Sequence, residues 1–195
     1  MLDIGANADC RPEYLQQFAI MGSVYAEKMR GIKNPRVGLL NNGEEPGKGN
    51  ELMKNTYPLL ESCGINFVGN VEAKDVFAEK ADVVVTDGFT GNMLLKSSEA
   101  TAKLMTSILK EGLMSSFPGK IAGLLAKPVF KELKSKLDPN EIGAAPLLGI
   151  DGLSFVGHGR SNSTALINGM KLAKTAADMD LIALIRDAVQ TQLSE

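Results

Sequence analysis

The stretch ADVVVTDGFTGNMLLK, residues 81–96, begins with a run of valines, breaks into small and polar residues, and then becomes apolar again. A valine-rich run that is followed by a longer periodic segment is typical of a central parallel strand that leads into a helix. In open α/β sheets, ligands bind outside the carboxyl ends of the strands, where helix N-termini expose amides suited to an anion. The turn at residues 87–92 is therefore a candidate binding site, although ordinary strand-to-helix turns have a similar composition.

Further strand patterns occur at residues 2–4, 35–41 and 65–75, and helical patterns separate them. Strands that alternate with helices indicate parallel β-α-β units. We therefore expect a single α/β domain over residues 1–195, with a doubly wound, mostly parallel sheet. A last long helix is expected around residues 166–189, as a core helix or a dimer-packing helix.

Local residues predict where the first two long helices begin and end. Pro12 opens the first helix and Gly31 closes it. Either Gly49 or Asn50 can cap the second helix, and we expect Pro58 to kink or shorten it.

The composition limits the classes of function. Of the 195 residues, 44% are hydrophobic, so the chain can bury a sizeable core. A net charge of −2 and an aromatic content of 5% argue against nucleic acid as a partner. Two cysteines without a CxxC spacing and a single histidine make no recognisable zinc site, so no metal is expected. No apolar run approaches the roughly 20 residues that span a bilayer. We expect a soluble protein that can still touch a membrane surface.

Three turns share one composition, in which a strand is followed by Asn or Asp with glycines and then by a helix. They are DIGANAD at 3–9, NNGEEPGKGNE at 41–51 and DGFTGN at 87–92. Glycines let backbone amides approach a ligand closely, and Asn supplies an uncharged donor or acceptor. None of the turns matches the dinucleotide pattern or the P-loop spacing, so no nucleotide cofactor is predicted.

Two basic side chains in glycine-rich loops are candidates for anion binding. Lys48, between Gly47 and Gly49, is either a solvated loop charge or, just before a helix start, part of an anion site. His158 lies next to Arg160 in a loop rich in donors for a phosphate, although a lone histidine is commonly structural. No Ser-His-Asp arrangement or G-x-S-x-G elbow occurs, which argues against a serine acyl-enzyme.

Residues 110–136 contain six lysines and two glutamates, in a chain that is acidic as a whole. Apolar residues at helical spacing lie on both sides of Pro128. This pattern predicts two short amphipathic helices that form a basic hairpin over residues 110–137. The hairpin either packs its apolar stripe on its own domain or presents it to an acidic partner or an anionic membrane.

The motifs LDIGAN, FAIMGSVYA, NPRVGLLNNGEE, KGNEL, NFVGNVEAKD and ADVVVTDGFTGN occur in this order. Together they resemble the phosphate acyltransferase (PlsX) family of bacterial phospholipid synthesis, from Leu2 to near the C-terminus. The resemblance implies transfer of a long-chain fatty acyl group from acyl carrier protein to inorganic phosphate, without a cofactor. It also implies a homodimer with a Rossmann-like fold, related to phosphotransacetylases and isocitrate dehydrogenase-like enzymes, with a protruding amphipathic helical hairpin.

The resemblance also implies roles for individual residues. Lys48 of the KGNE motif and Asn92 are the expected catalytic residues. The residues expected to bind substrate or phosphate are Gly5, Asn7, Asn41, Gly49, Asn50, Asp87, Gly88, Thr90, Gly91 and His158. The hairpin residues expected to meet the carrier protein or the membrane are Lys120, Leu124, Leu125, Lys127, Lys131 and Lys134.

Members of this family are considerably longer and carry an N-terminal half with DAMGGD and SAGNTGA motifs, which do not occur in this chain. The chain thus resembles the C-terminal portion of the enzyme, with a sheet that is incomplete at the N-terminus. We expect a cytoplasmic protein that can lie at the membrane surface near a membrane glycerol-3-phosphate acyltransferase. The alternatives are a small-acyl phosphotransacetylase, a nicotinamide dehydrogenase of the same fold, or a non-catalytic fragment that only dimerises or docks on partners.

Overall fold

The computed structural model describes residues 1–193, without the side chains at 134–137, 139 and 193. The chain folds into two compact units. The first unit comprises residues 1–94, 148–153 and 175–193, and the second comprises residues 95–147 and 154–174. The expectation of one domain over the whole chain stays a prediction.

The first unit contains a parallel three-stranded sheet in the order β2-β1-β3. Its strands are β1 (Val37–Leu40), β2 (Phe67–Val71) and β3 (Val83–Val85). The predicted strand at residues 2–4 is reduced to a single parallel bridge between Leu2 and Val85. The N–H of Leu2 donates to the carbonyl oxygen of Val84 at 2.8 Å, which extends the parallel order beyond β3.

Helices cover both faces of this sheet. Successive residues of a strand point to opposite sides, so these strands place apolar side chains on both faces. Residues of β1 and β3 on one face pack against α1 (Pro12–Arg30), α2 (Glu51–Ser62) and α8 (Leu181–Leu193). Leu40, Val71 and Val84 on the other face pack with Val76 of α3 (Ala73–Phe77) and Leu94 of α4 (Gly88–Met114). The predicted α/β class and the Rossmann-like layering are confirmed.

Several helix boundaries follow the sequence prediction. Pro12 begins α1, and Gly31 ends it with φ 71° while its N–H donates to the carbonyl oxygen of Glu27 at 3.1 Å. Asn50 caps α2. The expected shortening at Pro58 is wrong, because α2 continues to Ser62. Burial of its face, which includes Leu60, offsets the hydrogen bond that proline cannot donate.

The expected single helix over residues 166–189 is also wrong. The structure contains α7 (Ser163–Asp178) and α8 instead. Asp180 lies between them with φ 49°, a left-handed conformation that ends one helix before the next begins. No glycine or proline marks this break in the sequence, which is why periodicity alone suggested one helix.

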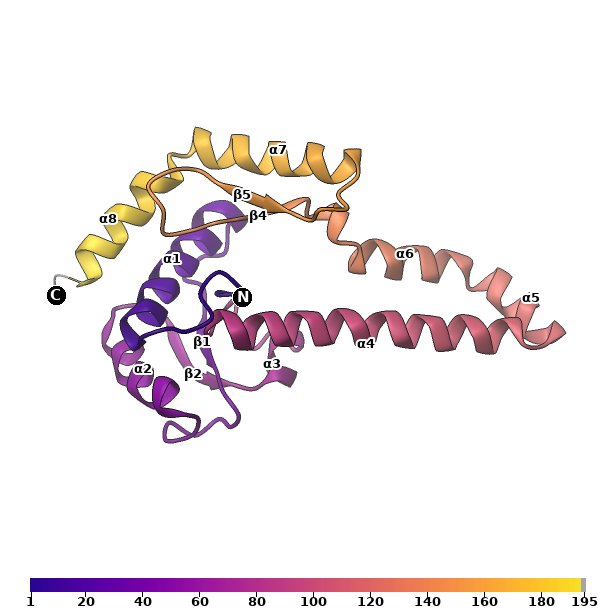
Figure 1. Cartoon of the computed structure of the whole chain (residues 1–195), viewed down its shortest axis with the longest axis horizontal. Helices are drawn as coiled ribbons and strands as arrows, with labels where there is room; N and C mark the ends of the chain where they lie inside the picture. The colour runs from indigo at the N-terminus through magenta and orange to yellow at the C-terminus, as the bar shows by residue number, and fades with distance from the viewer. Residues whose placement is uncertain (194–195) are drawn as a thin grey trace. The chain divides into compact units, whose positions relative to one another are not determined.

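The second unit continues along α4 into α5 (Phe117–Leu125), α6 (Lys127–Leu137) and the short 3₁₀ turn Pro139–Glu141. An antiparallel pair then follows, β4 (Ala144–Pro146) with β5 (Phe155–Gly157), which the sequence did not predict. The two short helices expected within residues 110–137 are α5 and α6, but the expected start of the hairpin is wrong. Its first residues, to Met114, belong to the long helix α4, and the chain reverses through α5 into α6 (Figure 1).

Candidate functional site

The three glycine-containing turns start from one edge of the sheet. β1 lies parallel to β3, and Leu2 bridges β3 in parallel on its far side. The turns at 3–9, 41–51 and 87–92 follow these three segments directly. Because the carboxyl ends of parallel strands share one edge, the fold brings the predicted turns to the place where α/β proteins bind ligands.

Two of these turns touch through their backbones. The N–H of Gly88 donates to the carbonyl oxygen of Asn7 at 2.8 Å. A Cβ atom at Gly88 would lie 2.6 Å from that oxygen, and one at Gly91 would lie 1.9 Å from the carbonyl oxygen of Asp3. Both glycines are therefore needed for the first turn of α4 to lie against the first turn of the chain.

Asp3, which sequence reasoning did not single out, organises the first turn. Its buried carboxylate accepts the backbone N–H groups of Gly5, Ala6 and Asn7 and the side-chain amide of Asn7, at 2.7–2.9 Å. Burial alone would raise the pKa of Asp3, but these hydrogen bonds outweigh it and hold that pKa below its usual value. The N–H groups of Gly5 and Asn7 thus donate to the Asp3 carboxylate and stabilise the turn. The sequence does contain a signal for this turn, because an aspartate shortly before a glycine often accepts hydrogen bonds from the backbone N–H groups that follow it.

Asp87 and Thr90 are engaged with each other at the start of α4. The Asp87 carboxylate accepts the N–H and the hydroxyl of Thr90, both at 2.8 Å. Asp87 is buried and acts as the cap of the helix. The half-buried side chain of Asn92 lies over Gly5, with its Cγ atom 3.6 Å from the position of a Cβ there. In the part of the chain that the structure describes, the Asn92 amide has no hydrogen-bond partner, so it is free to meet a ligand.

The turn at 41–51 holds Lys48 by its backbone. The Asn41 amide donates to the carbonyl oxygen of Lys48 at 3.0 Å, and Gly49 follows with φ 94°. Asn50 accepts the N–H of Met53 at 3.0 Å, so its side chain is used in capping α2. The ammonium group of Lys48 is exposed and forms no ion pair with any described residue. The Lys48 ammonium group is therefore available to bind an anion.

Ion pairs fix this turn to the β2 side of the sheet. Glu44 pairs with Lys80 at 3.1 Å, and the amide of Asn70 donates to the carbonyl oxygen of Glu45 at 2.7 Å. Glu44 also lies near the carboxylates of Glu72 and Asp75. Lys74 and Lys80 balance these acids, so the cluster anchors the loop.

Residues 1–184 match the family described as fatty acid synthesis protein. The chain belongs to this family. It is 48% identical over 189 residues to the phosphate acyltransferase of Elusimicrobium minutum (strain Pei191). The matched region covers 97% of this chain and 55% of that protein. It is 50% identical over 192 residues to the phosphate acyltransferases of Bacillus thuringiensis (strain Al Hakam) and Bacillus mycoides (strain KBAB4), which covers 98% of this chain and 58% of each. The chain thus spans little more than half the length of these relatives. The resemblance to phosphate acyltransferases is confirmed.

In this family member, the predicted hairpin residues lie on α5 and α6. Leu124 is 70% exposed and Leu125 is 76% exposed, and Phe117 at the start of α5 is 77% exposed. Lys120, Lys127 and Lys131 are also exposed, whereas the side chain of Lys134 lies outside the described residues. The apolar residues of α5 are therefore not packed on their own unit. No helix among the described residues is both long enough and apolar enough to cross a bilayer.

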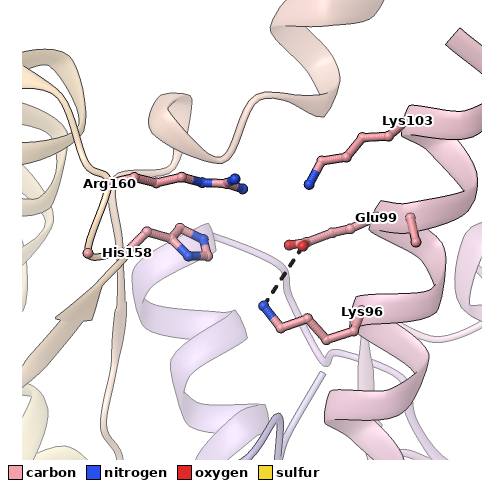
Figure 2. A pocket seen from close by; sticks show the side chains of 7 residues that line it. Lys96, Glu99, Lys103, His158 and Arg160 are labelled. Atoms are coloured by element: carbon pink, nitrogen blue, oxygen red, sulfur yellow. Dashed lines mark ion pairs between the residues drawn. The ribbon is translucent and has the colours of Figure 1, made fainter. Parts of the chain in front are cut away.

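His158, the remaining predicted site residue, belongs to the second unit. It follows β5 and is exposed, and its carbonyl oxygen accepts the N–H of Ser161 at 2.9 Å. Its side chain lines a pocket with residues of α4 that sequence reasoning missed (Figure 2).

Proposed function

We propose that this chain carries part of the active site of an acyltransferase that moves a long-chain fatty acyl group from acyl carrier protein to inorganic phosphate. The product is acyl phosphate, a precursor for phospholipid synthesis. The observation that carries the proposal is the pair of unengaged polar groups, Lys48 and Asn92, at one edge of a parallel sheet in a relative of phosphate acyltransferases.

The chemistry of this reaction fits such an edge. A phosphate oxygen attacks the thioester carbonyl carbon, a C–O bond forms, and the C–S bond then breaks to release the thiolate. Phosphate is the nucleophile, so the protein needs no nucleophile of its own. The leaving thiol has a pKa of about 8.5 by analogy with cysteine, so a strong general acid is not required.

The protein must hold phosphate against the carbonyl and stabilise the oxyanion that forms. In this proposal the Lys48 ammonium binds the phosphate dianion, and the Asn92 amide donates a hydrogen bond to the developing oxyanion. The close approach of Gly88 and Gly91 to the Asp3 turn fixes the start of α4, and thereby Asn92. Asp87 and Thr90 support the same helix start.

The exposed residues of α5 and α6 supply a docking surface in this proposal. Carrier proteins of this kind are acidic, and exposed lysines attract them, while exposed leucines can enter the interface of an anionic membrane. We place the protein in the cytoplasm, as a homodimer that contacts the membrane peripherally. A membrane glycerol-3-phosphate acyltransferase would then receive the acyl phosphate.

The test is to fuse the N-terminal segment of the Bacillus thuringiensis relative to this chain and to measure acyl phosphate formation. Palmitoyl carrier protein and inorganic phosphate are the substrates, and hydroxylamine traps the product. We expect phosphate-dependent product with the carrier-protein donor and little with acetyl-CoA. Product from acetyl-CoA alone would favour a small-acyl phosphotransacetylase, and no product from either donor would overturn the proposal.

A further inference from the structure

The second unit contains an open pocket between α4 and the loop that follows β5 (Figure 2). One wall is a face of α4, which carries Lys96, Glu99 and Lys103. Their spacing of three and four residues places them on the same side of the helix. The opposite wall is the loop with His158 and Arg160, and Figure 2 shows these two side chains pointing across the pocket toward the α4 residues.

The loop that forms the second wall is held at both ends. The N–H of Ser161 donates to the carbonyl oxygen of His158 at 2.9 Å, which closes a tight turn. Asn162 accepts the N–H of Ala165 at 3.0 Å and so caps the start of α7. These bonds fix the backbone from which His158 and Arg160 extend, and both walls of the pocket belong to the second unit.

Positive charge in this pocket exceeds negative charge. Lys96, Lys103 and Arg160 face a single carboxylate, that of Glu99. The ion pair between Lys96 and Glu99 is long, at 3.9 Å. Among the described residues, Lys103 and Arg160 have no ion pair at all. Like charges that point into one space repel each other unless an anion lies between them.

We propose that this pocket binds a phosphate group. An arginine guanidinium donates two parallel hydrogen bonds to a phosphate, a lysine adds a point charge, and an imidazole donates from one ring nitrogen even when neutral. Ala100 and Gly159 complete the lining, which contains no phenylalanine, tyrosine or tryptophan side chain. Three cationic side chains against one carboxylate therefore suit this pocket to a phosphate group.

This inference rests on the proposed function, because phosphate is a substrate there, and it assigns a phosphate site in the second unit in addition to Lys48 in the first. The same chemistry has two sources in that reaction. One is inorganic phosphate, and the other is the phosphate ester in the pantetheine arm that holds the acyl group on its carrier. Both are tested as separate ligands.

The experiment measures direct binding of inorganic phosphate and of 4′-phosphopantetheine to the 195-residue chain by calorimetry. The variants are Lys103→Gln and Arg160→Gln, with Arg160→Lys to separate charge from bidentate geometry. Lys110→Gln on the same helix is the matched control, since Lys110 is exposed and lies outside the pocket. Circular dichroism verifies that each variant is folded.

We expect Lys103→Gln and Arg160→Gln each to weaken binding by about tenfold, the scale of one charged hydrogen bond. Arg160→Lys restores part of the loss, and Lys110→Gln leaves binding unchanged. The ligand that binds more tightly to the unmodified chain identifies the source. Equal affinities of all variants, or no binding of either ligand, would overturn the proposal that this pocket binds phosphate.

The same variants separate this inference from the proposed function. If the extended chain forms no acyl phosphate but phosphate binding still depends on Arg160, the pocket stands and the function fails. If acyl phosphate forms while Arg160→Gln changes neither binding nor the KM for phosphate, the function stands and the pocket fails.

Discussion

Gly91 lies against Asp3 so closely that a Cβ atom on the glycine would fall 1.9 Å from the aspartate's carbonyl oxygen. Both partners are backbone, so neither can move aside as a flexible side chain would. We predict that Gly91→Ala lowers the free energy of unfolding by about 3 kcal/mol, the upper range for overpacking a close contact. Chemical denaturation with urea measures this change.

Gly112→Ala is the matched control for this prediction. Gly112 lies in the same helix, α4, and a Cβ atom there would meet nothing within 4 Å. Alanine at this exposed helical position should raise the free energy of unfolding by about 0.5–1 kcal/mol. Equal effects of the two substitutions would contradict the role of Gly91 in holding α4 against the first turn.

The Asp3 carboxylate makes stability depend on pH. Its pKa in the folded chain lies below the value of about 3.9 for an unfolded aspartate, so the unfolded chain binds the proton more tightly. The contribution of Asp3 is therefore complete above that value and is lost as pH falls through the folded pKa. We predict that Asp3→Asn removes this part of the acid sensitivity and destabilises the chain at pH 7 by about 1–3 kcal/mol.

Urea denaturation of wild type and Asp3→Asn across pH 2–7 is the measurement. Asp9→Asn serves as the comparison, because Asp9 is exposed at the end of the same turn. If both variants keep the acid sensitivity of the wild type, Asp3 is not the group responsible.

Lys48 should affect turnover and not folding. In the chain extended at its N-terminus, we predict that Lys48→Ala lowers acyl phosphate formation by on the order of 10², the scale for losing one preorganised donor. The unfolding midpoint should not change, since the Lys48 side chain is exposed. Lys54→Ala, at an exposed position of α2, is the control that should leave turnover unchanged. Equal turnover of Lys48→Ala and wild type at both low and saturating phosphate would make Lys48 a solvated charge.

These residues show what a sequence can reveal. The sequence predicts Gly31 as one helix cap and either Gly49 or Asn50 as another, because capping is a local property of a few neighbouring residues, and the structure has Gly31 and Asn50. The contact of Gly91 with Asp3 and the pocket that joins Lys103 to Arg160 depend on segments far apart in the chain. Hydrophobic periodicity predicts the strands and helices, and with them the sheet edge at which the turns lie. It does not predict which residues from distant segments come into contact.

The lysines of α5 and α6 should govern attraction to an acidic partner. We predict that charge reversal at Lys127, Lys131 and Lys134 weakens binding of acyl carrier protein and reduces the salt dependence of what remains. Exposed charges are screened beyond about 8 Å at physiological ionic strength, so the wild-type affinity should fall steeply with added salt. Surface plasmon resonance over a salt series measures both effects. Charge reversal at Lys33, an exposed position of the first unit, is the control, and equal losses there would indicate only a bulk charge effect.

The exposed leucines of α5 should govern contact with a lipid surface. Leu124 and Leu125 lie in a helix whose apolar residues are not covered by its own unit, so a bilayer can bury them. Burial of one leucine contributes about 1.5–3 kcal/mol, and we therefore predict that Leu124→Glu with Leu125→Glu lowers the affinity for anionic vesicles by at least about 10². Sedimentation with phosphatidylglycerol vesicles measures this affinity. Ser115→Glu adds charge just before α5 without removing apolar surface, and it should weaken binding far less. Wild-type sedimentation of the double variant would show that α5 does not enter the membrane.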